Sequence, residues 1–218
     1  MTIRVAINGY GGIGRCILRS IFENNRQNDF AVVAINDVSG IKATAHLTRY
    51  DSTHGRFQHD VHVDGDQLVV DGHSITVISE RDPKVLPWKA LGIDLVFECT
   101  GRFTQRDDAM QHIHAGAKKV LISAPGKGSD ATIVYGVNHQ TLEDSCQIVS
   151  NASCTTNCLA PVIKPLQEKI CIEKGLLNTI HAYTKDQMLL DGNHSDLHRA
   201  RSATQSIIPT KTGAASAV

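Results

Sequence analysis

The fold of this chain is determined near its beginning by the stretch IRVAINGYGGIG, residues 3–14. Its first half is mostly apolar, which predicts a buried strand over residues 3–8, and a Gly-rich turn follows. Apolar side chains then recur at helical spacing through residues 16–22, and residues 30–35 form a second continuous apolar run. A strand, a turn, a helix and another strand in this order predict a βαβ unit, which implies a parallel sheet.

The alternation of strands and helices continues beyond this first unit. Further strands are expected over residues 95–99, 119–123, 133–135 and 147–150, with a helix over residues 107–114. Residues 61–79 instead alternate apolar and polar side chains around Asp-Gly pairs, which predicts an antiparallel excursion from the sheet. We therefore expect residues 1–153 to form an α/β domain with a Rossmann-type doubly wound parallel sheet.

A second region begins at Cys154. A helix is expected over residues 154–170, and the prolines within it, Pro161 and Pro165, predict a kink or an early end. The apolar run at residues 176–183 predicts a strand. Residues 185–209 are polar, rich in His and Arg, and weakly periodic, which predicts a long functional loop or interaction arm in contact with a neighbouring subunit.

Composition argues against several classes of function. Lys plus Arg and Asp plus Glu both number 22, so the formal net charge is zero, which argues against nucleic acid and anionic membranes as partners. No apolar run is long enough to span a bilayer, and the N-terminus leads straight into a strand without a signal peptide. The six cysteines include no Cys-x-x-Cys pair, so we expect free thiols in a reducing cytoplasm.

The Gly-rich turn at residues 9–14 matches the pattern G-x-G-x-x-G between a strand and a helix. Such a turn lets a pyrophosphate approach the helix N-terminus. Asp37 follows the second strand, where a carboxylate can accept hydrogen bonds from ribose hydroxyls and repels a 2′-phosphate. The combination predicts NAD rather than NADP as the cofactor. The alternative interpretation is a structural turn followed by an Asx-capped strand end.

Cys154 is the candidate nucleophile. It lies between Ser153 and Thr155 where a strand gives way to a helix, so unpaired backbone N–H groups favour its thiolate. An imidazole from His181, which ends the apolar run, would activate the sulfur. A buried structural cysteine is the alternative. Cys158 lies one helical turn further on, but no additional ligands have metal-like spacing, so we expect no metal and interpret Cys158 as a packed apolar side chain.

Together these segments resemble the phosphorylating, NAD-dependent glyceraldehyde-3-phosphate dehydrogenase family. The run SNASCTTNC over residues 150–158 is the most specific of them. The other matching segments follow one another along the whole chain, at residues 8–15, 35–37, 50–57, 80–83, 98–101, 181–184 and 206–213. The resemblance implies that residues 154–218 are the N-terminal part of an α+β catalytic domain, incomplete relative to the family.

The resemblance also implies roles for individual residues. Cys154 is expected to be the nucleophile and His181 its activator. The residues expected to line the NAD site are Gly9, Gly11, Gly12, Ile13, Gly14, Asp37, Arg81, Thr100 and Ser123. The residues expected to bind the substrate and inorganic phosphate are Ser153, Thr155, Thr184, Arg201, Thr212 and Gly213. Hydroxyls, a guanidinium and backbone N–H groups are suited to phosphate oxygens.

The implied activity is the NAD-dependent oxidative phosphorylation of glyceraldehyde 3-phosphate to 1,3-bisphosphoglycerate, a step of glycolysis. It would proceed through a thiohemiacetal and a thioester on Cys154. The resemblance further implies a cytoplasmic homotetramer for a complete chain.

Two departures from the family change these expectations. Gly12 stands where the family usually has Arg, which removes a side chain near the pyrophosphate, so we expect weaker NAD binding. Family members are also longer at the C-terminal end. We therefore expect the second domain of a 218-residue chain to have an uncovered sheet edge, and the chain alone to be unstable or poorly active.

Other functions are compatible with parts of the sequence. Erythrose-4-phosphate dehydrogenase shares the nucleotide domain and the cysteine run, although the hydroxyl of Thr184 favours the shorter triose substrate. A non-catalytic NAD-binding fragment is a second alternative. A papain-like cysteine hydrolase is a third, against which the Gly-rich βαβ unit and Asp37 argue.

Overall fold

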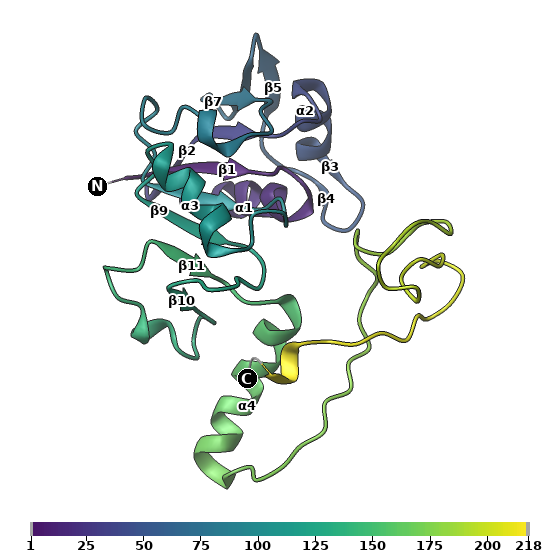
Figure 1. The fold of residues 1–218 in the computed structure, drawn as a ribbon. Coiled ribbons are helices and arrows are strands. Elements are labelled where there is room, and N and C mark those ends of the chain that lie inside the picture. Colours follow the sequence, from purple (N-terminus) through teal and green to yellow (C-terminus); the bar gives the residue numbers. More distant parts are fainter. Residues whose placement is uncertain (1, 217–218) are drawn as a thin grey trace. The chain divides into compact units, whose positions relative to one another are not determined.

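The computed structural model describes residues 2–216. The chain folds as two compact units, unit 1 over Met1–Ser153 and unit 2 over Cys154–Val218 (Figure 1). No helix within the described residues is long and apolar enough to cross a membrane.

Unit 1 is built on one nine-stranded sheet with the order β10-β11-β9-β8-β1-β2-β7-β6-β5. The parallel strands are β1 (Ile3–Asn8), β2 (Phe30–Asn36), β7 (His73–Ile78), β8 (Leu95–Glu98), β9 (Lys119–Ile122), β10 (Ala131–Thr132) and β11 (Ile148–Ser150). The antiparallel strands β5 (Val61–Asp64) and β6 (Gln67–Val70) extend the sheet beyond β7, and β3 (Tyr50–Asp51) pairs with β4 (Gly55–Arg56) separately. The strand order changes direction between β1 and β8, as in a doubly wound sheet, which confirms the predicted Rossmann-type fold. The antiparallel strands β5 and β6 confirm the predicted excursion from the sheet.

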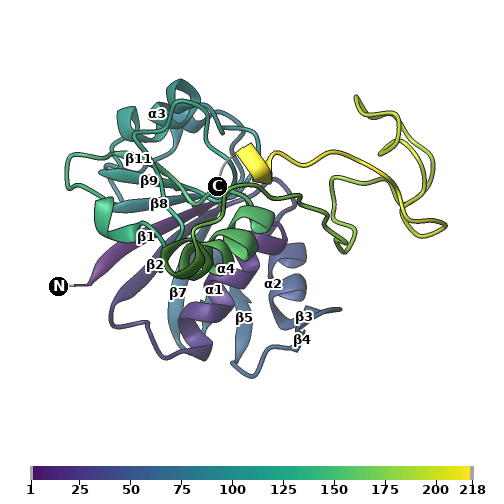
Figure 2. The ribbon, with the colours of Figure 1, turned by 90° about the horizontal axis from the view of Figure 1, so that it is seen from below.

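Helices cover both faces of this sheet, as its buried apolar strands require. α1 (Gly12–Glu23) and α2 (Ile41–Arg49) contribute Leu18 and Ala45 to one core cluster, whereas α3 (Arg106–His114) contributes Ala109 to the other. Figure 2 shows α1 and α3 on opposite sides of the strands. Successive residues of a strand face opposite sides, so Ala6 and Ile7 of β1 belong to different clusters.

The strand predicted over residues 133–135 is wrong, because β10 ends at Thr132. The backbone N–H of Val134 donates to Oδ1 of Asn138 at 2.8 Å, and the N–H of Val137 donates to the Val134 carbonyl at 3.0 Å. The asparagine side chain thus supports a turn that takes the backbone out of the ladder.

In unit 2, α4 (Cys154–Ile170) is continuous through Pro161 and Pro165, so the predicted early end is wrong. Each proline removes one intrahelical donor, and both prolines lie on the exposed side of α4. The helix ends at Ile170, and the next residue, Cys171, adopts a φ of 60° and donates its N–H to the Gln167 carbonyl at 3.2 Å.

The strand predicted over residues 176–183 is also wrong. This segment has no regular structure, and Leu176 and Ile180 within it are almost fully exposed. A strand needs a neighbouring strand to satisfy its backbone groups, and none of the described residues pairs with this run. The apolar pattern was therefore not sufficient to define a strand.

Residues 185–209 form a loop without helix or strand, as predicted. The loop is held by a bridge between Met188 and Ser202, and the Ser202 hydroxyl donates to the Leu189 carbonyl at 2.7 Å. The short helix η3 (Ala214–Ser216) then packs against α4. The predicted contact of the loop with a neighbouring subunit stays a prediction.

Candidate active site

The predicted NAD-lining residues of unit 1 lie in loops at the C-terminal ends of the parallel strands. Gly9 follows β1, Asp37 follows β2 and Thr100 follows β8, beside the point where the strand order reverses. Ligands bind at such switch points in open α/β sheets. A Cβ on Gly9 would lie 2.6 Å from the backbone nitrogen of Thr100, and the φ of Gly9 is 88°, so only glycine fits there.

The N-terminus of α1 is open to an anion. Its N-cap is Gly11, no side chain caps it, and no acidic residue lies in its first turn. A Cβ added at Gly11 or Gly12 would have no atom within 4 Å, and the Ile13 side chain is exposed. A bare helix N-terminus with free space beside it fits a pyrophosphate, which is the group that NAD would place there.

Asp37 is held beside the glycine turn. Its Oδ2 accepts from the Tyr10 backbone N–H at 2.7 Å, and its Oδ1 accepts from the Ser39 N–H at 2.8 Å. The carboxylate is thus fixed at the end of β2 with its negative charge next to the turn. This placement fits the recognition of ribose hydroxyls and the exclusion of a 2′-phosphate.

Two further predicted residues lie on the same edge of the sheet. Arg81 follows β7, and its backbone N–H donates to Oε1 of Glu80 at 2.6 Å. Ser123 follows β9, and its N–H donates to the Glu98 carbonyl at 3.0 Å. The structure therefore places every predicted cofactor residue at this edge, although their roles toward NAD stay predictions.

Cys154 and His181 meet within unit 2. Sγ of Cys154 lies 3.2 Å from Nε2 of His181, whose Nδ1 lies 2.6 Å from the Ala182 carbonyl. The carbonyl can only accept, so Nδ1 carries a proton and Nε2 is the atom that faces the sulfur. Cys154 is the first residue of α4, whose first turn has no acidic residue. Both side chains are exposed.

Their mutual contact shifts both pKa values in the direction of an ion pair. The hydrogen bond to His181 lowers the pKa of Cys154, the hydroxyl and N–H of Thr155 add to this, and partial desolvation opposes it. The hydrogen bond to the Ala182 carbonyl and then that to Cys154 raise the pKa of His181. This arrangement favours a thiolate beside an imidazolium, which is an activated sulfur nucleophile.

Within the described part of unit 2, three of the predicted substrate residues have separate partners. Arg201 pairs with Asp191 at 3.3 Å, the Thr184 N–H donates to Gln187 at 3.2 Å, and the Thr212 hydroxyl accepts from the Ala214 N–H at 3.2 Å. Within residues 2–216, no hydrogen bond or ion pair joins Thr184, Arg201 and Thr212. Gly213 precedes η3, and Ser153 belongs to unit 1. Thr155 contacts the reactive sulfur directly.

All six cysteines are free thiols. The interpretation of Cys158 as a packed side chain is wrong: Cys158 is exposed, because α4 buries only Thr156 and Ala160. Cys99, by contrast, is partly buried. Its burial raises the pKa of this thiol to about 12, so the thiol stays protonated. Among the described residues, no group of three or more His, Cys, Asp or Glu side chains could hold a metal ion.

Sequence reasoning missed a set of buried polar side chains on the same sheet edge. They are Asn8, Asn36, Glu98 and His112, and each is almost completely buried. A signal was present for some of them, since Asn8, Asn36 and Glu98 are the last residues of mostly apolar strands.

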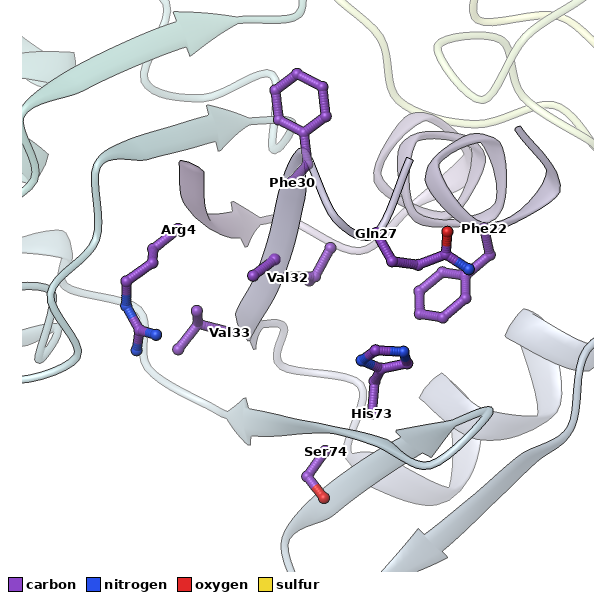
Figure 3. A pocket seen from close by; sticks show the side chains of 9 residues that line it. Arg4, Phe22, Gln27, Phe30, Val32, Val33, His73 and Ser74 are labelled. Atoms are coloured by element: carbon purple, nitrogen blue, oxygen red, sulfur yellow. The ribbon is translucent and has the colours of Figure 1, made fainter. Parts of the chain in front are cut away.

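A cavity of about 240 Å³ in unit 1 lies at the opposite end of the parallel strands, where they begin (Figure 3). It opens between the beginnings of β2 and β7, where the ladder that joins these strands starts only at Ala34 and Thr76. Phe22, Gln27 and His73 line it together with the first residues of β2. None of the predicted site residues borders this cavity, so it is not the cofactor site.

Comparison with known proteins finds the same family along both units of the chain. The family model described as "Glyceraldehyde 3-phosphate dehydrogenase, NAD binding domain" matches residues 3–106, and the one for the C-terminal domain matches residues 153–218. The first of these matches confirms the prediction of NAD as the cofactor, whereas the predicted bounds of the domain stay a prediction.

Curated relatives match the whole chain. A glyceraldehyde-3-phosphate dehydrogenase of Cupriavidus necator is 58% identical over 219 residues, one of Pseudomonas aeruginosa is 59% identical over 218 residues, and one of Geobacillus stearothermophilus is 52% identical over 219 residues. Each alignment covers 100% of this chain and 64–65% of the relative, so the chain spans slightly less than two thirds of their length. The chain belongs to the glyceraldehyde-3-phosphate dehydrogenase family.

Proposed function

We propose that this protein catalyses the NAD-dependent oxidative phosphorylation of glyceraldehyde 3-phosphate to 1,3-bisphosphoglycerate. The observation that carries the proposal is the 3.2 Å contact between Cys154 Sγ and His181 Nε2 at the start of α4. A chain that belongs to this family and pairs a reactive thiolate with an NAD-binding domain has the parts that this reaction needs.

The Cys154 thiolate attacks the aldehyde carbon and forms a thiohemiacetal. The imidazolium of His181 donates its Nε2 proton to the developing alkoxide, which leaves the imidazole neutral. The same nitrogen then takes this proton back as the carbon is oxidised to a thioester. NAD⁺, when bound, accepts the hydride in this step. Thr155, which also bonds the sulfur, keeps it oriented.

Inorganic phosphate then attacks the thioester carbon, the C–S bond breaks, and the acyl phosphate leaves, while the proton of the attacking hydrogen phosphate is released to solvent. The departing sulfur returns to the thiolate form beside the imidazolium, so the starting ion pair is restored. A sulfur leaving group suits this step because a thioester retains the free energy of the oxidation until phosphate captures it. An oxygen ester on a serine would be a poorer acyl donor to phosphate.

The remaining predicted roles are part of the proposal. Thr184, Arg201, Thr212 and Gly213, together with Ser153, are proposed to bind the phosphate groups, for which their donors are suited. The resemblance supports a cytoplasmic homotetramer in which the loop over residues 185–209 contacts a neighbouring subunit.

A single-turnover experiment tests the reaction. The NAD-saturated chain is mixed rapidly with glyceraldehyde 3-phosphate, with and without inorganic phosphate, and NADH formation is followed by absorbance. We expect a burst equal to the concentration of Cys154 thiolate, turnover only when phosphate is present, and a faster burst than with erythrose 4-phosphate. Cys154→Ser is expected to abolish the burst, and Cys158→Ser, on the same helix, to retain it. NAD binding without a burst would contradict the proposed reaction and indicate a nucleotide-binding protein only.

A further inference from the structure

A hydrogen-bonded row of buried polar side chains runs along the C-terminal ends of the strands in unit 1. Asn8 is 2%, Glu98 1%, His112 0% and Asn36 5% exposed. Asn8 on β1 is the register partner of both Glu98 on β8 and Asn36 on β2, so three adjacent strands end in a polar residue at one level. Burying polar groups costs free energy unless they are fully paired, which makes such a row unusual in a core.

Glu98 is the centre of this hydrogen-bonded row. Its Oε2 accepts from Nδ2 of Asn8 at 2.6 Å and from Nε2 of His112 at 3.0 Å. Its Oε1 accepts from the backbone N–H of Thr100 at 2.8 Å and from the Thr100 hydroxyl. All of these partners act as donors, which is the set of contacts that a carboxylate can satisfy.

The first end of the hydrogen-bonded row is held in the core by Trp88. The indole Nε1 of Trp88 can only donate, and it lies 3.0 Å from Nδ1 of His112. Nδ1 is therefore the acceptor, and Nε2 carries the proton that His112 donates to Glu98. Trp88 and His112 are both fully buried, so the imidazole has one orientation and one tautomer.

The second end reaches the turn after β7. Oδ1 of Asn8 accepts from Nδ2 of Asn36 at 2.7 Å. Asn36 in turn exchanges two hydrogen bonds with the backbone of Glu80, each 2.8 Å long, and Glu80 precedes Arg81. The hydrogen-bonded row thus connects the ends of β8, β1 and β2 with the turn after β7. The proposed NAD residues lie in the loops that follow these strands.

The loops after β1 and β8 also touch directly. The Thr100 backbone leaves no space for a Cβ at Gly9, and the Arg102 N–H donates to the Thr100 hydroxyl at 3.0 Å. A movement of Thr100 therefore displaces the glycine turn as well. Glu98 bonds both sides of this contact, through Asn8 next to Gly9 and through Thr100.

We propose that Glu98 is a positioning residue for the dinucleotide. By holding Asn8 and Thr100 on its two carboxylate oxygens, it fixes the loops after β1 and β8 relative to each other. The open N-terminus of α1 and Thr100 then meet NAD in one arrangement that is already formed before binding. The inference rests on the proposed NAD site, and Glu98 itself acts through its neighbours rather than by touching the cofactor.

Glu98→Gln tests this inference, because it keeps the size of the side chain but turns one acceptor into a donor. The new amide faces donors at Asn8 and His112 or at Thr100, so the loops lose their common anchor. We expect NAD binding, measured by isothermal titration calorimetry on the full chain, to weaken by about tenfold.

Asp94→Asn is the matched control at the opposite end of β8. The Asp94 carboxylate accepts from the Arg4 N–H at 2.9 Å and pairs with Lys118 at 2.7 Å. Its loss removes comparable hydrogen bonds from the same strand but not from the cofactor edge. We expect both variants to lower Tm, whereas the NAD affinity of Asp94→Asn changes by less than about twofold.

Trp88 supplies a second readout, because it is the only tryptophan in the sequence. Its indole N–H gives one cross-peak in a ¹H–¹⁵N spectrum. We expect saturating NAD to shift this peak in the wild type and in Asp94→Asn, through Thr100, Glu98 and His112, but not in Glu98→Gln. Equal NAD affinities and equal shifts in the two variants would overturn the inference and leave Glu98 a structural residue.

The proposed reaction can fail separately. Wild-type chain that binds NAD and loses it on Asp37→Ala, but shows no NADH burst, would contradict the reaction and still support the role of Glu98 if the affinities differ as expected. Wild-type chain that binds no NAD would overturn both. Should Glu98→Gln not fold, Trp88→Phe removes the anchor of His112 from a distance, with an expected loss of about threefold in NAD affinity. An unchanged affinity in that variant would overturn the inference.

Discussion

Unit 1 and unit 2 contain similar apolar residues but place them differently. In unit 1, large side chains such as Ile7, Ile35 and Leu68 are completely buried. In the described part of unit 2, the buried side chains are small or polar, namely Thr156, Ala160, Ser202 and Ala214, whereas Leu176 and Ile207 are exposed. The difference teaches that an apolar run becomes a strand or a core only where other elements cover it.

The same contrast applies to the two halves of the proposed chemistry. The cofactor edge of unit 1 is held by buried hydrogen bonds, among them those of Glu98. The Cys154–His181 pair of unit 2 is exposed and depends on one contact between two side chains. Changes in unit 1 should therefore act mainly on stability and NAD affinity, and changes in unit 2 mainly on thiol reactivity.

The largest expected effect is the difference in stability between a substitution at a buried position of unit 1 and one at an exposed position of unit 2. Leu18→Ala empties a completely buried position of α1 and should reduce the free energy of unfolding by about 2–5 kcal/mol. Leu176→Ala alters a fully exposed position, so its effect should stay within about 0.5 kcal/mol. Urea denaturation followed by far-UV circular dichroism, which reports the helices of both units, measures both effects. A comparable loss in Leu176→Ala would show that this side chain is packed in solution.

A smaller effect is expected at the glycine turn. Gly9→Ala places a Cβ 2.6 Å from the Thr100 nitrogen at a φ of 88°, which should cost at least about 2 kcal/mol of stability. Gly12→Ala adds a Cβ in open space within the first turn of α1 and should stabilise the chain by up to about 1 kcal/mol. Thermal unfolding compares the two. Equal destabilisation would mean that the loops after β1 and β8 are not in contact in solution.

In unit 2, His181→Asn should slow the alkylation of Cys154 by iodoacetamide. The hydrogen bond to His181 is the largest cause that lowers the pKa of Cys154, so its removal raises this pKa toward the ordinary thiol value of about 8.5. The thiolate is lost as pH falls through the pKa, so the variant should lose reactivity at a higher pH than the wild type. The rate at pH 7 should fall by about tenfold, whereas above about pH 9 the two should agree.

Peptide mapping of the alkylated protein identifies the thiol that reacts. Cys158, exposed on the same helix, is the internal comparison, and its rate should not respond to His181→Asn. Rates of Cys154 that are equal in both proteins at every pH would contradict an imidazole-activated sulfur.

The sequence was informative where local pattern and tertiary contact coincide. The apolar runs at residues 3–8 and 30–35 become the adjacent strands β1 and β2, and the Gly-rich turn between them leads into α1. The same kind of run at residues 176–183 finds no partner strand among the described residues and stays irregular. Periodicity describes one segment, but pairing is a property of two.

The candidate site shows the same limit. The reactive pair was predictable because Cys154 begins a helix and His181 ends an apolar run, and the structure brings their side chains together. Glu98 was not identified, because its importance arises from donors on β1, on α3 and in the loop after β8. Cys158 was misassigned since the pattern does not show that α4 leaves that side exposed.

The smallest expected effect concerns Gly12 in the glycine turn. Gly12 lies in open space beside the uncapped N-terminus of α1, so a longer side chain fits there. Gly12→Arg adds a guanidinium near the expected pyrophosphate and should tighten NAD binding by about threefold at low salt, with the gain reduced at 1 M salt because screening weakens the contact. Gly12→Gln is the uncharged control of similar reach. If calorimetry finds the same affinity for both variants at low salt, charge at this position does not contribute, and the pyrophosphate would have to lie away from the start of α1.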